Sequence, residues 1–274
     1  MKPVKALVLS GYGLNCDYET VHAFEQAGAS ARRVHINDVI QQRVQLADFH
    51  ILAFIGGFSW GDDHGAGVIQ AHRLKTHIGD QLLAFVADGK LIIGICNGFQ
   101  TLVNMGLLPG NERGTVCFDR SVALTANACG NFRDAWVHLA ADPESPCVFT
   151  KGFDHVAFPV RHGEGQFVTD TATLARLKAN HQVVFRYAGP DGTPAGGAFP
   201  DNPNGSMDDI AGICDPTGRI FGLMPHPEAY HHPANHPDWF RMREQKKRKG
   251  IPGLIEETPG IRLFRNAVEA MAAG

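Results

Sequence analysis

The chain has 274 residues and a formal net charge of −3 at neutral pH, and 44% of its residues are hydrophobic. This length is sufficient for one large domain with a full hydrophobic core. The small net charge gives no electrostatic reason to expect binding to nucleic acid or to a membrane surface. No apolar run approaches the roughly 20 residues that span a bilayer, and the opening Met1-Lys2-Pro3 does not resemble a secretory signal.

The six cysteines show no pattern of disulfide pairing. They stand at positions 16, 96, 117, 129, 147 and 214, without a Cys-x-x-Cys pair. We therefore expect reduced thiols and a cytoplasmic protein.

Strand-like and helix-like segments alternate over the first hundred residues. Short apolar runs predict buried strands at 4–9, 31–36, 48–55 and 91–95. Apolar residues at helical spacing predict one helix from Asp17 to the stop at Gly28, and a long helix over 68–87. This alternation is typical of a parallel sheet with helices on both faces.

After Gly110 the sequence becomes richer in strand-like segments. They lie at 134–139, 155–160, 182–187, 210–214 and 220–224, and a helix is predicted over 261–271. We find no repeat and no linker. We therefore predict a single α/β domain over 1–274, with an open, mostly parallel sheet flanked by helices and a β-rich second half.

A cysteine stands at the end of the fourth predicted strand, in Gly94-Ile95-Cys96-Asn97-Gly98. This Gly-x-Cys-x-Gly pattern is the thiol counterpart of the nucleophile elbow, a sharp strand-to-helix turn that exposes a reactive side chain. Ligands of open α/β sheets lie at the carboxyl ends of the strands, and a helix N-terminus favours the thiolate. We predict that Cys96 is a nucleophile. For the other five cysteines we prefer the alternative, a small buried apolar residue.

A histidine follows the last predicted strand, in the sequence MPHPE. The prolines on both sides of His226 restrict its backbone. In an extended segment residues i and i+2 point the same way, so that Glu228 can reach the imidazole of His226. A nucleophilic thiol needs a base, and the base needs an orienting group. Cys96, His226 and Glu228 are therefore the candidate catalytic residues.

Two glycine pairs follow predicted strands. Backbone N–H groups at Gly56-Gly57 and at Asn97 are candidate donors to the oxyanion of an acyl-transfer reaction, and an ordinary glycine-rich turn at 56–57 fits the residues equally well. Gly11-x-Gly13 lacks the third glycine of a dinucleotide fingerprint, and we assign it no function.

Five segments together resemble the class I glutamine amidotransferases. In chain order they are GGFSWGD, GICNGFQ, FPVRHGEGQF, DNPNGS and GLMPHPE. The cysteine elbow and the His-x-Glu pair are shared by the class. The HGEG and NPNGS pieces resemble, more narrowly, the glutaminase subunits of phosphoribosylformylglycinamidine synthases. The likeness runs from residue 4 to residue 228, returns at 260–264, and implies a flavodoxin-like sheet.

The resemblance implies that Cys96 attacks the side-chain amide of glutamine, that His226 shuttles the proton and that Glu228 orients His226. Ammonia then passes to a synthetase subunit, which uses ATP and Mg²⁺ to convert formylglycinamide ribonucleotide to formylglycinamidine ribonucleotide in de novo purine biosynthesis. The chain itself is expected to bind no cofactor and no metal. The resemblance leaves room for a small accessory subunit.

The same likeness assigns residues to the glutamine pocket and the oxyanion loop. They are Gly57, Asn97, Gln100, Phe132 and His162, with Glu164 near the pocket or the partner face. One segment departs from the family pattern Asn-x-Ser-Gly-Arg/Lys-Phe, because this chain has Asn-Ala-Cys-Gly-Asn-Phe over 127–132. The polar contacts of this segment are therefore not implied by the resemblance.

The stretch 231–259 is longer than the family pattern and is predicted to be an insert. It contains His231, His232 and His236, but no cysteine or acidic residue joins them at ligand spacing, so that we expect solvated loop histidines. The basic run 241–249 is predicted to be a solvated face, with docking to a partner as the alternative.

Three other functions compete with this interpretation. The chain could serve another amidotransferase pathway, which differs only in the partner that it activates. It could be a thiol-dependent redox or chaperone protein on a similar sheet, although the Glu228 partner of His226 argues against that class. It could also be a metal-binding module built on the histidines.

Overall fold

The computed structural model describes residues 3–111, 118–251 and 257–273, so that Cys117 and part of the predicted insert lie outside the described residues. Its strands are β1 Lys5–Ser10, β2 Ser30–His35, β3 Ile51–Phe54, β4 Leu91–Ile95, β5 Val122–Ala126, β6 Arg133–Ala141, β7 His155–His162, β8 Glu164–Thr169, β9 Val183–Ala188, β10 Ile210–Cys214 and β11 Ile220–Leu223. Within the described ranges they form a nine-stranded sheet, in the order β2-β1-β3-β4-β11-β10-β9-β6-β7, and the two-stranded sheet β5-β8.

One half of the main sheet is parallel. Strands β2, β1, β3, β4 and β11 run in the same direction. In the β4–β11 pair, Ile95 lies opposite Leu223, and the N–H of Cys96 donates to the carbonyl of Leu223 at 2.9 Å. The segments that follow β4 and β11 therefore begin side by side at one edge of the sheet, although more than 120 residues separate them in sequence.

The other half of the sheet is antiparallel. Strands β10, β9, β6 and β7 extend the sheet beyond β11 with alternating directions. The β-rich second half therefore continues the sheet of the first half. The predicted α/β class, an open sheet flanked by helices, is confirmed.

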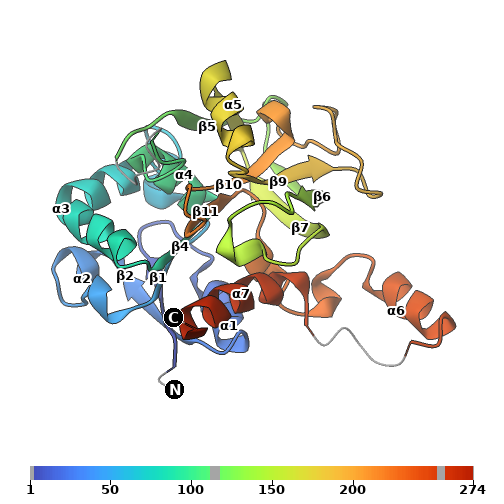
Figure 1. Cartoon of the computed structure of the whole chain (residues 1–274), viewed down its shortest axis with the longest axis horizontal. Coiled ribbons are helices and arrows are strands. Elements are labelled where there is room, and N and C mark those ends of the chain that lie inside the picture. Colours follow the sequence, from blue (N-terminus) through green and yellow to red (C-terminus); the bar gives the residue numbers. More distant parts are fainter. Residues whose placement is uncertain (1–2, 112–117, 252–256, 274) are drawn as a thin grey trace.

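Helices cover both faces of this sheet (Figure 1). They are α1 Asp17–Gln26, α2 Ile36–Ile40, α3 Val68–Ala87, α4 Asn97–Met105, α5 Thr171–Ala179, α6 Trp239–Arg248 and α7 Pro259–Ala273. Helices α1 and α7 pack together through Phe24 and Phe264, whose rings lie 4.7 Å apart. Helix α4 packs against α3 and against β3, β4 and β11. The buried hydrophobic residues form one cluster that reaches from Val4 to Val268.

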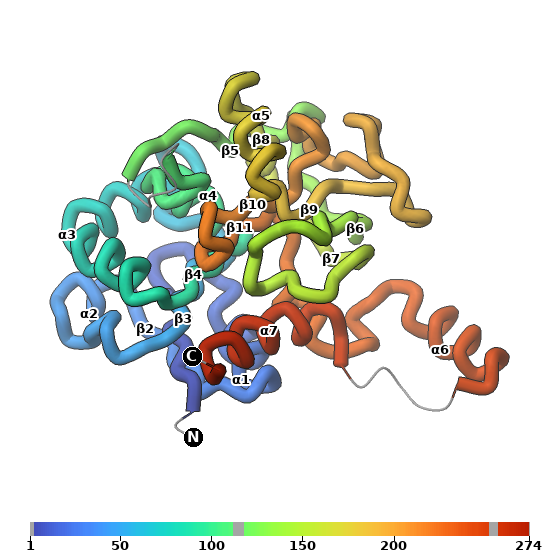
Figure 2. Tube along the Cα trace, in the orientation of Figure 1, coloured from blue at the N-terminus to red at the C-terminus, as the bar shows by residue number. Residues whose placement is uncertain are grey.

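Several predicted elements differ from the observed ones. The strand predicted over 48–55 begins only at Ile51, because Leu46–Asp48 forms a 3-10 turn. Helices α2, α5 and α6 and strands β5 and β8 were not predicted. Helix α6 has no buried residue and projects from the body of the molecule, as Figures 1 and 2 show. Among the described residues, no helix is both long and apolar enough to cross a membrane. The single domain over 1–274 stays a prediction.

Candidate active site

Cys96 occupies a strained turn between β4 and α4. Its backbone angles are φ 52° and ψ −108°, which place a non-glycine residue in a sparsely populated region. The flanking glycines are required by packing. A Cβ atom on Gly98 would lie 2.0 Å from the carbonyl oxygen of Phe54, and one on Gly94 would lie 2.5 Å from Leu102. The predicted elbow is therefore present, with Cys96 held at the N-terminus of α4.

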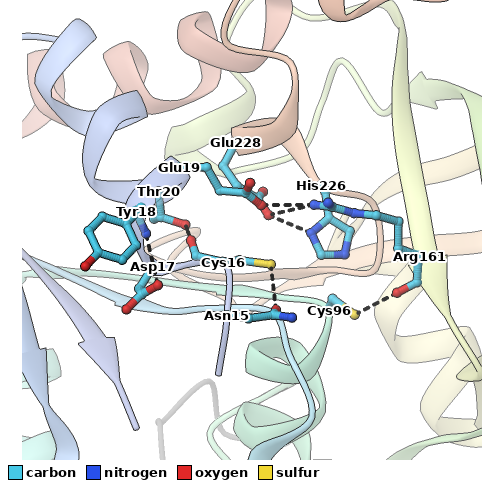
Figure 3. A network of polar contacts seen from close by, with 10 residues as sticks. All are labelled: Asn15, Cys16, Asp17, Tyr18, Glu19, Thr20, Cys96, Arg161, His226 and Glu228. Carbon is cyan, nitrogen blue, oxygen red and sulfur yellow. Dashed lines mark hydrogen bonds and ion pairs between the residues drawn. The ribbon is translucent and has the colours of Figure 1, made fainter. Parts of the chain in front are cut away.

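His226 and Glu228 lie together directly after β11. The backbone N–H of His226 donates to the carbonyl of Pro159 at 2.8 Å, which fixes the segment against β7. The Nδ1 atom of His226 lies 2.6 Å from Oε1 of Glu228, and the carboxylate is completely buried. Figure 3 shows Cys96 on the side of the imidazole that faces away from Glu228. The structure therefore brings the three candidate catalytic residues to one place.

The electrostatic surroundings of His226 favour its charged form. Burial alone lowers the pKa of His226, but the Glu228 carboxylate and the Cys96 and Cys16 sulfur atoms together raise that pKa well above its ordinary value. In the described part of the chain, Nε2 of His226 is buried and has no hydrogen-bond partner. Because Nδ1 is bound to Glu228, Nε2 is the atom available for proton transfer.

Arg161 adds a positive charge beside the buried carboxylate. Its guanidinium lies 3.8 Å from Oε1 of Glu228 and 3.0 Å from Glu19. The Arg161 side chain is about one third exposed, so that its charge is partly screened by solvent. The guanidinium therefore lies between the two carboxylates of Glu228 and Glu19 and is close to both. Neither Arg161 nor Glu19 was predicted.

Cys16 is a second thiol at this site. It precedes α1 in the loop after β1, and its Sγ atom donates to Oδ1 of Asn15 at 3.5 Å. Burial raises the pKa of the Cys16 thiol to about 11, and the neighbouring imidazole of His226 opposes that rise. The prediction of a buried apolar cysteine is right about burial and wrong about surroundings, because the neighbour of Cys16 is the imidazole.

A pocket of about 210 Å³ opens onto the imidazole. Its lining includes Gly57, Phe58, Phe132, Arg161 and His226. The φ of Gly57 is +143°, and a Cβ atom there would lie 2.6 Å from the carbonyl oxygen of Gly13, so that only glycine fits. Phe132 is half-exposed, and its ring lies 6.4 Å from that of Phe58. The structure therefore places Gly57 and Phe132 at the entrance to the site.

Asn97 and Gln100 lie on the first turn of α4 and are both buried. The Asn97 amide donates to Asp62 at 2.9 Å, and the Gln100 amide donates to the backbone carbonyl of Glu164 at 2.6 Å. Burial raises the pKa of Asp62 to about 6; the hydrogen bond from Asn97 opposes the rise and the Glu164 carboxylate adds to it. The helix that begins at the elbow is thus tied to β8 and to the turn after β3.

His162 is buried at the end of β7. Its Nδ1 lies 3.1 Å from Oδ1 of Asn127, whose amide donates to the carbonyls of His162 and Asn131. Burial lowers the pKa of His162 to about 3, and the nearby His226 contributes to this shift. The imidazole of His162 is therefore neutral at physiological pH. Asn127 anchors the 127–132 segment despite its departure from the family pattern.

The NPNGS segment forms a buried polar network. Oδ1 of Asn202 accepts from the N–H groups of Gly205 and Ser206, and its amide donates to Asp209 at 2.8 Å. The Asn204 amide donates to the carbonyl of Gly165 at 2.9 Å, in strand β8. The segment therefore supports the strand that carries Glu164 and follows His162, rather than contacting the pocket itself.

The remaining described cysteines differ in exposure. Cys147 and Cys214 are buried, as predicted. Cys129 is exposed, which contradicts the prediction. It lies on a turn where Arg133 donates to its sulfur at 3.2 Å. The pKa of the Cys129 thiol is lowered by a hydrogen bond with the backbone of Asn131 and by the side chain of Arg133.

The three insert histidines make local contacts. His231 packs against His22 at 5.1 Å, and His236 packs against Trp136 at 4.6 Å. His232 caps a 3-10 turn by accepting from the N–H of Ala234. His231 and His236 are half-buried, so that the expectation of solvated loop histidines holds only for His232.

Comparisons with known proteins agree with this geometry. Residues 3–270 match the family described as the CobB/CobQ-like glutamine amidotransferase domain. The phosphoribosylformylglycinamidine synthase subunit PurQ of Methanococcus maripaludis S2 is 48% identical over 269 residues, which is 97% of this chain and 96% of that protein. The subunit of the same name from Dehalococcoides mccartyi is 43% identical, over 98% of both chains. A chain in the structure of PurLQS from Thermotoga maritima has 28% identity and a TM-score of 0.67, with 98% of this chain and 99% of that chain covered.

Proposed function

Because the chain belongs to the family of CobB/CobQ-like glutamine amidotransferase domains, we propose that it is the glutaminase subunit of a phosphoribosylformylglycinamidine synthase. It hydrolyses glutamine to glutamate and ammonia, and a synthetase subunit uses the ammonia to convert formylglycinamide ribonucleotide to the amidine. The observation that carries the proposal is the buried His226–Glu228 pair beside Cys96 on a strained strand-to-helix turn.

The first half of the reaction is acylation of the thiol. The thiol proton of Cys96 passes to Nε2 of His226, and the resulting thiolate attacks the carbonyl carbon of the glutamine amide. The Glu228 carboxylate stabilises the imidazolium that forms, at the 2.6 Å contact with Nδ1. The N–H groups of Gly57 and Asn97 stabilise the oxyanion. The amide nitrogen then takes the proton from Nε2 and leaves as ammonia, and a thioester remains.

The second half of the reaction is hydrolysis of this thioester. His226 takes a proton from water through Nε2, the resulting hydroxide attacks the thioester carbon, and glutamate leaves as Cys96 recovers its proton. Phe132 is half-exposed and lines the pocket, and its backbone is the proposed contact for the glutamine α-amino group. Gln100, whose amide donates to the backbone carbonyl of Glu164, braces the first turn of α4 next to Cys96. His162 stays neutral and supports the pocket through Asn127.

The partners follow from the same function. The synthetase subunit binds and uses ATP and Mg²⁺, and this chain binds neither. A small accessory subunit completes the assembly, in agreement with the three components, L, Q and S, in the name PurLQS of the similar structure. The purine pathway places the chain in the cytoplasm.

One experiment tests both the reaction and the pathway. The purified chain is mixed with the synthetase and the small subunit, ATP, Mg²⁺, formylglycinamide ribonucleotide and glutamine labelled at its amide nitrogen. We expect labelled formylglycinamidine ribonucleotide, detected by mass spectrometry. Glutamate production without any labelled amidine, in the presence of a synthetase that accepts free ammonium, would assign the chain to another amidotransferase pathway.

A further inference from the structure

Cys16 is a buried thiol that the proposed reaction does not use, and it lies against the imidazole of His226. The two side chains meet over Gly56, where a Cβ atom would lie 3.0 Å from Sγ of Cys16 and 3.4 Å from Nδ1 of His226. Glu228 lies 2.6 Å from the same nitrogen. A thiol, an imidazole and a carboxylate therefore converge on one point beside the pocket (Figure 3).

The spacing of these donors is close to that of a metal site. One donor atom from each of Cys16, His226 and Glu228 lies within 4.8 Å of the other two. A tetrahedral Zn²⁺ ion holds sulfur at ~2.3 Å and nitrogen or oxygen at ~2.0–2.2 Å, so that its ligands lie roughly 3.3–3.7 Å apart. Oε2 of Glu228, which is buried without a partner among the described residues, is available as the oxygen ligand.

We propose that Cys16, His226 and Glu228 bind a transition-metal dication of the Zn²⁺ or Co²⁺ type, and that the bound metal blocks glutamine hydrolysis. Sulfur and imidazole donors select these ions over Mg²⁺ and Ca²⁺, which prefer oxygen ligands alone. Three protein ligands leave a fourth position for water, on the side of Asn15, whose Oδ1 lies 3.5 Å from Sγ of Cys16. The pocket of about 210 Å³ gives the ion a path from solvent.

The charges around the site determine its affinity for the metal ion. Metal binding releases the thiol proton of Cys16 and the Nδ1 proton of His226 to solvent. The Cys16 thiolate and the Glu228 carboxylate then neutralise the dication. Arg161 lies 3.8 Å from Glu228 and weakens the site, but its guanidinium is paired with Glu19 at 3.0 Å. The site is therefore suited to reversible inhibition rather than to a permanent structural metal.

Inhibition follows from the role of His226 in the proposed function. A metal on Nδ1 occupies the lone pair of that nitrogen, so that the ring keeps its remaining proton on Nε2. Nε2 then cannot accept the proton of Cys96. The metal also removes Glu228 from its position as the orienting group.

Cobalt spectroscopy tests the site without reference to activity. The full chain, with Cys117 and Cys129 changed to serine, is titrated with Co²⁺, and the thiolate-to-cobalt charge-transfer band is recorded. We expect one band per chain, its persistence in Cys96→Ala and its loss in Cys16→Ser and Cys16→Ala. A band that survives both Cys16 variants, or one that disappears in Cys96→Ala or in Cys214→Ser, would place the metal elsewhere and overturn the proposal.

Zinc inhibition tests the consequence in the assembled enzyme. Each variant is compared with its own rate in the presence of a chelator, and the Zn²⁺ concentration for half-inhibition is measured. We expect Cys16→Ser to raise this concentration by at least ~10-fold, because mutation of residues that only support metal ligands already lowers metal affinity by about that factor. An unchanged concentration would refute the inhibitory role. A metal-free parent without glutaminase activity would instead refute the proposed function, while the cobalt band would still report on the site.

Discussion

The Nδ1 atom of His226 lies 2.6 Å from a carboxylate oxygen of Glu228, and both side chains are almost completely shielded from solvent. Only one residue separates them in sequence, and a 3-10 turn that begins at Pro227 brings them together. The carboxylate has no exposed surface, so that its interaction with the imidazole is weakly screened. This contact fixes the ring with Nε2 free on the side of Cys96.

Replacement of Cys96 separates glutamine hydrolysis from synthesis. We expect Cys96→Ala to abolish glutamine hydrolysis, because no other thiol in the described structure stands on a strand-to-helix elbow. The same variant, mixed with its synthetase, should still form the amidine from ammonium at high pH, where free ammonia is available. The measurement is product formation with each nitrogen source. Retention of glutamine-dependent synthesis would remove Cys96 from its assigned role.

Replacement of Glu228 tests the orienting contact. Glu228→Gln preserves the shape of the side chain but removes the charge that stabilises the imidazolium of His226. We expect kcat to fall on the order of 10²–10⁴-fold, the range of a general acid–base contribution. The loss should be smaller than that of Cys96→Ala when both are measured at saturating glutamine. A variant with the parent's kcat would show that the buried contact has no catalytic role.

Much of this site was predictable because its signals are local. The elbow at Cys96 needs glycines two residues away on each side. His226 and Glu228 are only two positions apart, although a 3-10 turn, and not the extended segment that was predicted, brings them together. Helix α3, predicted over 68–87, and strand β4, predicted over 91–95, have the observed bounds because apolar spacing and flanking glycines coincide there.

The parts that sequence reasoning missed depend on contacts between distant segments. Cys16 and His226 are 210 positions apart, and no spacing rule connects them. A usable signal did exist, since Cys16 follows the first strand at the sheet edge where Cys96 also lies. Helix α5 has only one buried residue, Leu177, so that its sequence shows little amphipathic pattern. The exposure of Cys129 is set by a turn whose shape residue types alone do not specify.

The burial of His162 makes stability depend on pH. Its folded-state pKa of about 3 lies below the ~6.5 of an unfolded histidine. Between these values the unfolded chain binds the additional proton, so that His162 alone should lower the free energy of unfolding by about 1.4 kcal/mol for each unit that the pH falls within this range. We expect His162→Gln to lose this dependence, measured by urea unfolding between pH 6 and pH 4.

The raised pKa of His226 acts in a different pH range. Below ~6.5 this histidine is protonated in both the folded and the unfolded chain, so that it adds no slope there. Its stabilising contribution is present below that pH and is lost as the pH rises through the folded-state pKa. Equal slopes for the parent and His162→Gln between pH 6 and pH 4 would mean that His162 is protonated in the folded protein.

The packing of the elbow predicts that one added methyl group lowers the free energy of unfolding. A Cβ atom on Gly98 would lie 2.0 Å from the backbone oxygen of Phe54, which cannot rotate away. We expect Gly98→Ala to destabilise the fold by about 3 kcal/mol, the upper part of the usual range for overpacking. Gly163→Ala is the matched control, because its Cβ atom would meet nothing closer than 3.9 Å. Its unfolding free energy should stay within about 0.5 kcal/mol of the parent.

The projecting helix α6 is the element best placed to bind a partner through charge. Lys247 and Lys249 are exposed at its end, and the helix buries none of its residues. We expect Lys247→Glu combined with Lys249→Glu to weaken association with the synthetase, with a larger effect at low salt because exposed charges are screened by ions. Association is measured by titration at two salt concentrations. Lys5→Glu with Arg32→Glu, on β1 and β2 away from α6, makes the same change in net charge and should have a smaller effect.

Glutamine hydrolysis by the isolated chain separates docking from catalysis. Ammonia that the isolated chain releases is lost to solvent instead of reaching the synthetase, and a glycine pair such as Gly56-Gly57, which carries one oxyanion donor, allows more than one backbone orientation at little strain. A docked partner that favours the productive orientation would shift a population rather than add new groups. We therefore expect weak hydrolysis by the chain alone, strong stimulation by the nucleotide-loaded synthetase, and the same weak basal rate in the α6 variant. Full activity without a partner would contradict regulation by docking. A lower basal rate in the α6 variant would show that the substitutions act on the fold rather than on docking.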